Sequence, residues 1–169
     1  MVVVANIQNY KDKELSAAIA SWIDTTDWAN MTAVTLTMKK GSVIDDVWVP
    51  VDELRCRKAL KHYVHRVNRA VYKNDYRKKK KRCRVVAAVE CDADGRWHVH
   101  AAIEGPAEMG AFQFEFCLRT QWRKIFGSDK FWVKRNADLG WIKYMFKHRQ
   151  KGMFDQDIDG LDLGSYSNH

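Results

Sequence analysis

Residues 84–104 read RVVAAVECDADGRWHVHAAIE, two apolar runs separated by aspartates and a glycine. This is the clearest β-hairpin signal in the chain. A three-residue loop that ends with Gly95 in the left-handed conformation would pair Asp92 with Arg96. A two-residue turn would instead put Glu90 on the apolar side, where an unpaired carboxylate is costly. We therefore expect the three-residue loop.

This register sorts the side chains of the hairpin onto two faces, because successive residues of a strand point to opposite sides. The apolar residues then share a face that helices can bury. The other face carries Glu90, His98 and His100, and the small Ala88 and Ala102 leave room around them. Two imidazoles and a carboxylate suit a divalent metal ion, Mn²⁺ or Mg²⁺ before Zn²⁺. A polar face open to solvent is the alternative interpretation.

Hydrophobic spacing predicts the elements on both sides of the hairpin. Residues 31–39 alternate and are rich in valine and threonine, which favours a strand. Pro50, tolerated in a first turn, begins a helix that ends near Tyr72 and buries Leu54 in its apolar stripe. The remaining expected elements are helices at 11–27, 109–126 and 137–150 and a strand at 130–135.

The expected order is a helix, then β-α-β-β-α-β, then a helix. This is an α+β fold with a ferredoxin-like split βαβ core, an antiparallel sheet, an extra N-terminal helix and a C-terminal helix that carries Tyr144. We expect residues 1–150 to form a single domain and residues 151–169 to be an acidic, flexible tail. The fold alone does not specify a function.

Charge and aromatic content favour a nucleic-acid partner. The net charge is +8 and the chain has seven tryptophans; cations attract phosphate, and indole rings stack on bases. Trp97 falls on the buried face of the hairpin, so Trp132 or Trp141 is the better candidate to stack on a base. The densest basic segment can follow a DNA backbone or form a solvated loop. Its basic residues are Arg77, Lys78, Lys79, Lys80, Lys81, Arg82 and Arg84.

Other features narrow the class of protein. No apolar run approaches the roughly 20 residues that span a bilayer, so we expect no membrane partner. The opening MVVVANIQNY shows no basic leader and no cleavage pattern, so we expect no secretory signal. The four cysteines are scattered without a close pair. This favours a reducing compartment over a zinc knuckle or a disulfide framework.

Residues 140–147 read GWIKYMFK, in which Tyr144 and Lys147 lie three apart and therefore share a helix face. Gly140 lies one turn earlier and leaves space for a close backbone approach. Together with VTLTMK at 34–39 and WHVHAAIE at 97–104, this segment resembles three motifs of the HUH endonucleases. The closest resemblance is to rolling-circle replication initiator proteins with a single catalytic tyrosine, and it covers residues 33–148.

The resemblance implies site-specific nicking and joining of single-stranded DNA. Glu90, His98 and His100 would hold the metal ion, Tyr144 would form a 5′-phosphotyrosine link, and Lys147 would assist it. The reaction would initiate replication of a plasmid, a phage or a small single-stranded DNA replicon. The residues expected to support DNA binding are Thr35, Thr37, Lys39, Lys143 and the basic residues of 77–84.

The resemblance also implies partners and a location. The substrate would be single-stranded or stem-loop origin DNA, and a host or replicon helicase would assist. The protein would act in a bacterial cytoplasm, or in the host nucleus if it comes from a eukaryotic virus. A monomer is the favoured state.

Two other functions fit parts of the sequence. A non-catalytic single-stranded nucleic-acid-binding module can share the strand order, but it would carry aromatic residues on the open sheet face instead of histidines. A single-tyrosine transposase of the same superfamily also places its tyrosine after the histidines.

Overall fold

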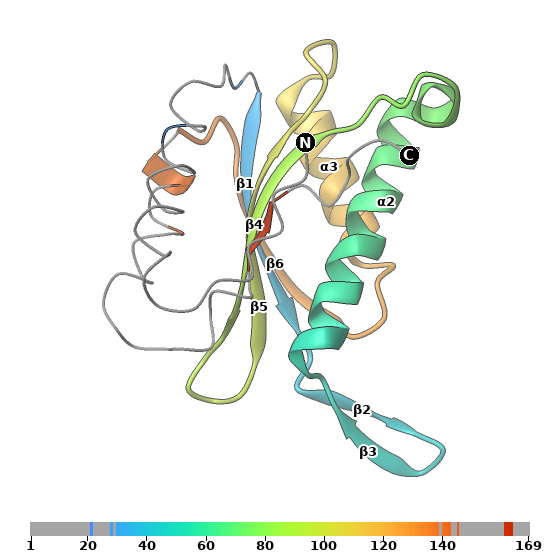
Figure 1. The fold of residues 1–169 in the computed structure, drawn as a ribbon, viewed down its shortest axis with the longest axis vertical. Coiled ribbons are helices and arrows are strands. Elements are labelled where there is room, and N and C mark those ends of the chain that lie inside the picture. The colour runs from blue at the N-terminus through green and yellow to red at the C-terminus, as the bar shows by residue number, and fades with distance from the viewer. Residues whose placement is uncertain are drawn as a thin grey trace.

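The computed structural model describes residues 30–138, 140–142 and 161–163, together with Ser21, Trp28 and Met145. The predicted helix at 11–27 and most of the one at 137–150 fall outside these residues. Figure 1 shows the arrangement. In chain order the elements are β1 (Met31–Met38), β2 (Gly41–Ile44), β3 (Val47–Pro50), α2 (Glu53–Lys78), β4 (Arg84–Cys91), β5 (Trp97–Glu104), α3 (Ala111–Trp122), β6 (Ser128–Lys134) and β7 (Leu161–Leu163).

The main sheet confirms the predicted fold class. Its strand order is β6-β1-β5-β4-β7, and neighbouring strands run antiparallel. The sequence β1-α2-β4-β5-α3-β6 thus forms a ferredoxin-like split βαβ core, with α2 and α3 on one side of the sheet (Figure 1). We expected a flexible tail at 151–169, but residues 161–163 form β7, which pairs with β4 at the sheet edge. None of the described helices is both long and apolar enough to cross a membrane.

The hairpin register is also confirmed. Glu90 lies opposite His98, and Ala88 lies opposite His100. The Asp92 N–H donates to the Arg96 carbonyl at 3.0 Å. Gly95 has a φ of +73°, the left-handed conformation that the three-residue loop requires. The pairing therefore places Glu90 and both histidines on one face.

The core fills the space between the sheet and the two helices. Val34, Leu36, Val99 and other alternate strand residues pack against α2 and α3. Tyr63 of α2 meets Trp122 of α3 edge to face, with the ring centroids 5.5 Å apart. Burial raises the pKa of Tyr63 well above its usual value, so this phenol is a structural group.

The predicted start of α2 was wrong. Pro50 ends β3 and pairs with Gly41, and the helix begins at Glu53. Asp52 is the N-cap, and its Oδ1 accepts from the Arg55 N–H at 2.7 Å. Leu54, expected in the buried stripe, is exposed because the helix starts three residues later than predicted.

The end of α2 also differs. The helix runs to Lys78 and includes a local break at Lys73, where φ is 49° and ψ is −118°. The basic segment that we expected after the helix therefore begins inside it, with Arg77 and Lys78 in its last turn.

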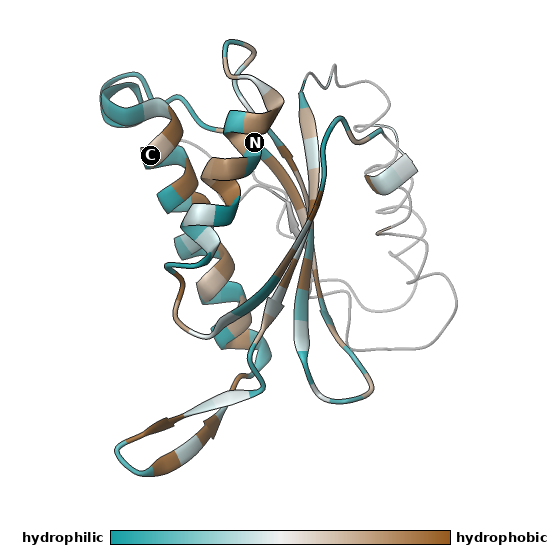
Figure 2. Ribbon diagram, turned by 180° about the vertical axis from the view of Figure 1, so that it is seen from behind, coloured by the Kyte–Doolittle hydropathy of each residue, from teal (hydrophilic) through white to brown (hydrophobic). Residues whose placement is uncertain are grey.

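The ribbon of β2 and β3 was not predicted. Asp45 and Asp46 connect its two short strands with φ values of 50° and 62°, as in a type I′ turn. Figure 2 shows the ribbon projecting from the body of the protein with apolar residues along it. Val43 and Trp48 are among these exposed residues.

Candidate functional site

The sheet face opposite α2 and α3 divides into two halves. The apolar half is closed, and its residues are Met31, Ala33, Val86, Ala102, Ala137, Ile142 and Met145. The polar half lies further along the same strands, and its residues are Thr35, Thr37, Glu90, His98 and His100. Ala102, which we expected to leave room beside the histidines, is fully buried in the apolar half because Ile142 and Met145 belong to the same packed cluster.

A threonine holds each histidine of the polar half. In the pairing of β1 with β5, Thr35 lies opposite His100 and Thr37 lies opposite His98. The Thr35 Oγ1 and the Thr37 Oγ1 are each 3.1 Å from Nδ1 of their histidine. When Nδ1–H donates to the hydroxyl, Nε2 keeps its lone pair, which is the form that binds metal ions. The threonines thus orient the two rings.

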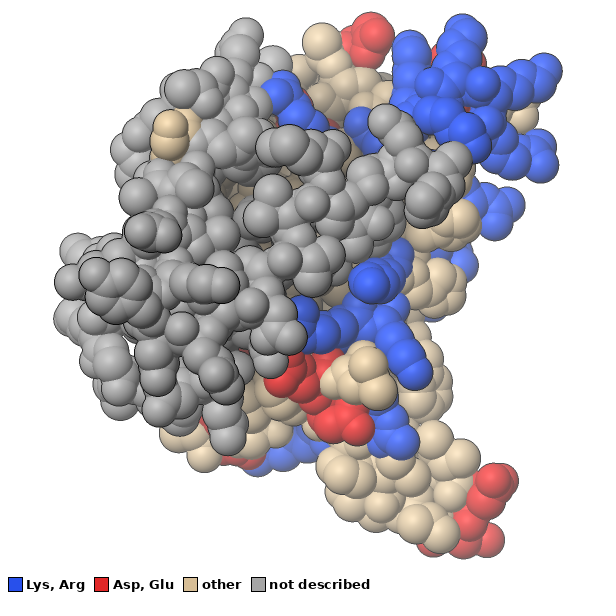
Figure 3. All heavy atoms as spheres, in the orientation of Figure 1, with Lys and Arg blue, Asp and Glu red and all other residues tan. Residues whose placement is uncertain are grey.

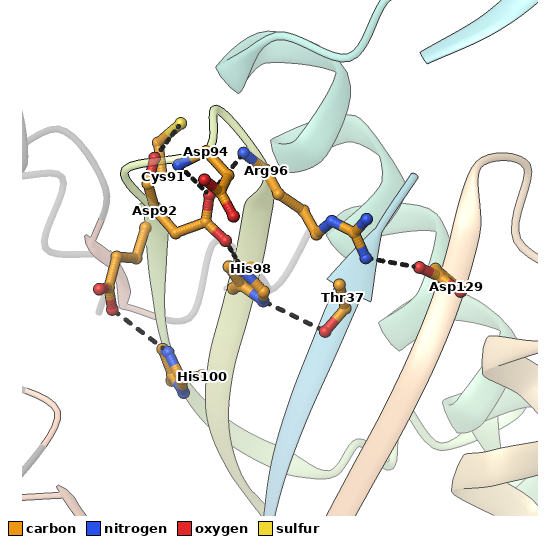
Figure 4. Close-up of polar contacts among 9 residues, drawn as sticks. Thr37, Cys91, Asp92, Asp94, Arg96, His98, His100 and Asp129 are labelled. Carbon is orange, nitrogen blue, oxygen red and sulfur yellow. Dashed lines mark hydrogen bonds and ion pairs between the residues drawn. The ribbon is translucent and has the colours of Figure 1, made fainter. Parts of the chain in front are cut away.

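On the other side, each histidine faces a carboxylate (Figure 4). The Nε2 of His100 is 3.2 Å from Glu90 Oε2, and the Nε2 of His98 is 2.9 Å from Asp92 Oδ2. Asp92 was missed as a site residue because we assigned it only to the turn. The signal was in the alternation, since Asp92 lies two residues after Glu90 and so shares its face.

Several donors stabilise the charged form of Asp92. His98 contacts Oδ2, and the backbone N–H groups of Arg96 and Asp94 donate to Oδ1 at 2.8 and 3.0 Å. These hydrogen bonds, first that with His98, lower the pKa of Asp92 below its usual value. Asp92 therefore remains a carboxylate under any neutral condition and anchors the hairpin turn beside His98.

The donor set fits a divalent cation in type, but the side chains form two separate pairs. The His98 and His100 ring centroids are 6.5 Å apart and the planes are inclined by only 23°. Within the described part of the chain, no three His, Cys, Asp or Glu side chains converge on one point that could hold a metal ion. Imidazole nitrogen and carboxylate oxygen are suitable ligands, so a shared ion would require the two rings to turn toward each other.

An open pocket adjoins the polar half. Trp132 and Trp141 stack with their ring centroids 5.3 Å apart, and Trp141 lies edge-on to His100 at 6.2 Å. The pocket has a volume of about 480 Å³. Its lining residues are Thr35, His100, Trp132, Lys134, Asp138, Gly140 and Trp141. Both tryptophans that we considered as base-stacking candidates thus lie beside the histidines.

The basic segment lies away from the histidines. It covers the end of α2 in Figure 3, and β4 separates its last residue, Arg84, from Glu90 by roughly 20 Å. The ammonium groups of Lys79 and Lys81 pair with Asp75 at 3.3 and 3.6 Å. The structure does not bring this segment to the site, so any DNA that it holds lies outside the polar half.

Two arginines of the basic segment have specific contacts. The Arg82 guanidinium lies over the Tyr76 ring, 4.4 Å from its centroid. Arg84 pairs with Glu104, where Nη2 donates to Oε1 at 2.8 Å, and it also lies over the Trp28 ring. The Arg84–Glu104 pair thus ties the start of β4 to the end of β5.

The other predicted site residues differ in how far the structure places them. Lys39 is exposed directly after β1, and its backbone N–H donates to the Gly127 carbonyl at 2.7 Å. Tyr144, Lys147 and Lys143 lie outside the described residues.

The fold and the site define an α+β protein whose open sheet face presents two threonine-held histidines and two carboxylates. The family model of the replication-associated protein ORF2 matches residues 31–153, which is more than half of the chain. The chain therefore belongs to this family of replication-associated proteins. Neither the curated proteins nor the solved structures include a significant match to the chain.

Proposed function

We propose that the chain is a metal-dependent nickase of the HUH type that starts rolling-circle replication. It would cut single-stranded DNA and rejoin it through a covalent link to Tyr144. The observation that carries the proposal is the pair of histidines, each held by a threonine and facing a carboxylate, on an open sheet face of a replication-associated protein.

Glu90, His98 and His100 would hold the metal ion, for which we favour Mn²⁺ or Mg²⁺. When bound, the ion would polarise a non-bridging oxygen of the scissile phosphate. Thr35 and Thr37 then have a clearer role than DNA contact, because they orient the ligand nitrogens. Asp92 would keep His98 in place before the ion binds.

Tyr144 would be the nucleophile. Its phenol oxygen, after losing its proton, would attack the phosphorus, and the 3′ oxygen of the preceding nucleotide would leave as a free hydroxyl. Lys147 would stabilise the phenolate. In support, Ile142 and Met145 flank Tyr144 in the sequence and pack on the sheet face that also carries the histidines. One ester bond replaces another, so the strand can be rejoined without ATP.

The remaining basic residues would hold the DNA on either side of the scissile phosphate. Lys39 and Lys143 would act near the sheet, and the basic segment at the end of α2 would bind a flanking strand or a stem-loop. This separation matches the distance along β4 between the segment and the polar half.

Trapping of the covalent intermediate tests the proposal. Labelled single-stranded and stem-loop DNAs are incubated with the protein and Mn²⁺, Mg²⁺ or EDTA, and a denaturing gel reveals protein linked to a 5′ end. We expect a metal-dependent adduct that is lost in Tyr144→Phe and in the His98→Ala/His100→Ala double variant. Tyr72→Phe is the matched control, because burial raises the pKa of that phenol and makes it a poor nucleophile.

Other outcomes would lead to other functions. Tight binding without an adduct from any DNA would identify a non-catalytic binding module. An adduct that forms equally well in EDTA would exclude the metal-dependent mechanism.

A further inference from the structure

We propose that Trp132 and Trp141 form a binding site for one base of a single-stranded DNA. The site would take the base next to the phosphate held at the polar half, and in this respect it rests on the proposed function. It adds a contact to the base, which the nicking chemistry itself does not require.

The position of Trp132 is the first observation. Its neighbours Phe131 and Val133 turn toward the core beneath the sheet, so Trp132 points to the opposite face, where it is 49% exposed. A large aromatic ring at an exposed position of a strand costs solubility and contributes little to the core. Its stacking on Trp141 at 5.3 Å makes a fixed aromatic surface instead of a mobile side chain.

The pocket beside this surface has the chemistry of a base site. Its walls include both indoles and the His100 ring, and its volume of about 480 Å³ admits a nucleotide-sized group. The Asp138 carboxylate also lines it and would repel a phosphate, whereas it can accept hydrogen bonds from a base. Lys134 on the same wall can bind the backbone of the strand.

A local detail keeps the pocket wall in place. Asp138 Oδ1 accepts from the Trp141 N–H at 3.3 Å. A Cβ atom at Gly140 would lie 2.9 Å from that oxygen, so any other residue at position 140 would displace Asp138. Glycine there lets Asp138 hold the backbone of Trp141 beside His100.

His100 links the two sites. It faces Glu90 through Nε2 and lies edge-on to Trp141 on the pocket side. A phosphate held at the polar half would therefore leave an adjoining base within reach of the two indoles. Base stacking on aromatic side chains tolerates any sequence, because every base has a π face.

The test compares two strands of equal length and charge, dT₂₀ and a strand of 20 abasic units, with EDTA present. We expect the protein to bind dT₂₀ more tightly than the abasic strand. Trp132→Ala should weaken dT₂₀ binding by about 5- to 150-fold and leave the abasic strand unaffected. The control Trp48→Ala removes a similarly exposed indole from β3, 58% exposed, and should change neither.

Several results would overturn the inference. These are equal weakening of both strands in Trp132→Ala, no weakening of either, or no binding of dT₂₀ by the unmodified protein. Trp132→Phe keeps an aromatic face and should retain most of the preference, which separates stacking from a loss of folding.

The failure of this site and the failure of the proposed function can be told apart. Binding in EDTA does not involve Tyr144, so Tyr144→Phe should show the full preference for dT₂₀. A normal adduct without any base preference would refute the base site alone. A base preference without any adduct would refute nicking alone.

Discussion

The two halves of the open sheet face lie on the same strands, yet one is closed and the other is not. In the apolar half, Ala33 and Ala102 are fully buried, in a cluster with Ile142 and Met145. In the polar half, His98 and His100 keep 21% and 23% of their side chains exposed. Small residues allow a segment to approach the sheet closely, whereas hydrogen-bonding residues keep their neighbours at a distance.

This contrast suggests a division of labour. The apolar half fixes the segment around Ile142 to the sheet, and the polar half offers ligands to the substrate. Trp141 lies at the boundary, since it packs on the apolar cluster and contacts the His100 ring. Variants in the two halves should therefore fail in different ways, by loss of activity or by loss of stability.

The largest effect is expected in the polar half. His100→Ala should reduce the rate of adduct formation at least about 100-fold, because it removes a metal ligand rather than a supporting contact. The half-exposed site should keep the melting temperature nearly unchanged. Quantified denaturing gels and thermal unfolding measure the two effects. His62→Ala, an exposed histidine of α2, is the matched control, and a His100→Ala variant within about twofold of the wild-type rate would contradict the assignment.

The apolar half should respond in stability. Ile142→Ala should lower the free energy of unfolding by about 2–5 kcal/mol, because it leaves a cavity beneath a fully buried side chain. Urea denaturation measures this change. The same substitution at Ile44, which is 44% exposed on the ribbon, should cost much less. Equal losses at the two positions would show that the segment is not packed on the sheet.

A smaller effect should come from the contacts that orient the ligands. Thr35→Val keeps the shape of the side chain but removes the hydroxyl next to His100 Nδ1. Loss of such a contact costs about 10- to 100-fold in metal affinity, and we expect the lower end of this range. Titration calorimetry with Mn²⁺ measures it. Thr32→Val, in the same strand and buried, should leave the affinity unchanged; equal losses in both variants would rule out an orienting role.

The smallest change is a difference in thiol reactivity. Burial raises the pKa of Cys56 and of Cys83 to about 12, so few thiolates form at pH 8. Cys91 is only partly buried, at the end of β4 near the polar half. A disulfide reagent should modify Cys91 in the folded protein well before Cys56 or Cys83, and should modify all of them in denaturant. Simultaneous modification in the folded state would contradict the described core.

The sequence predicted what depends on strand alternation and a short turn. The register of the β4–β5 hairpin followed from Gly95 and from the cost of burying Glu90, and the structure has that register. The split βαβ order followed from hydrophobic spacing alone. These features are local, because each depends on residues that are close in the chain.

The sequence analysis failed where main-chain pairing competes with propensity. Pro50 is typical of a first helical turn, but it lies in β3 because the ribbon pairs it with Gly41. The left-handed pair Asp45 and Asp46 was the available signal for this ribbon. The acidic tail contained no such signal, and its strand β7 forms only because β4 offers a free edge.

The sequence by itself determined that Glu90, His98 and His100 share one sheet face, since side chains two residues apart in a strand point the same way. The tertiary structure decided which groups each histidine meets. Only the pairing of β1 with β5 brings Thr35 and Thr37 to the histidines, and only the turn places Asp92 against His98. Contacts between distant segments cannot be derived from the spacing within either segment, because they depend on how the whole sheet is assembled.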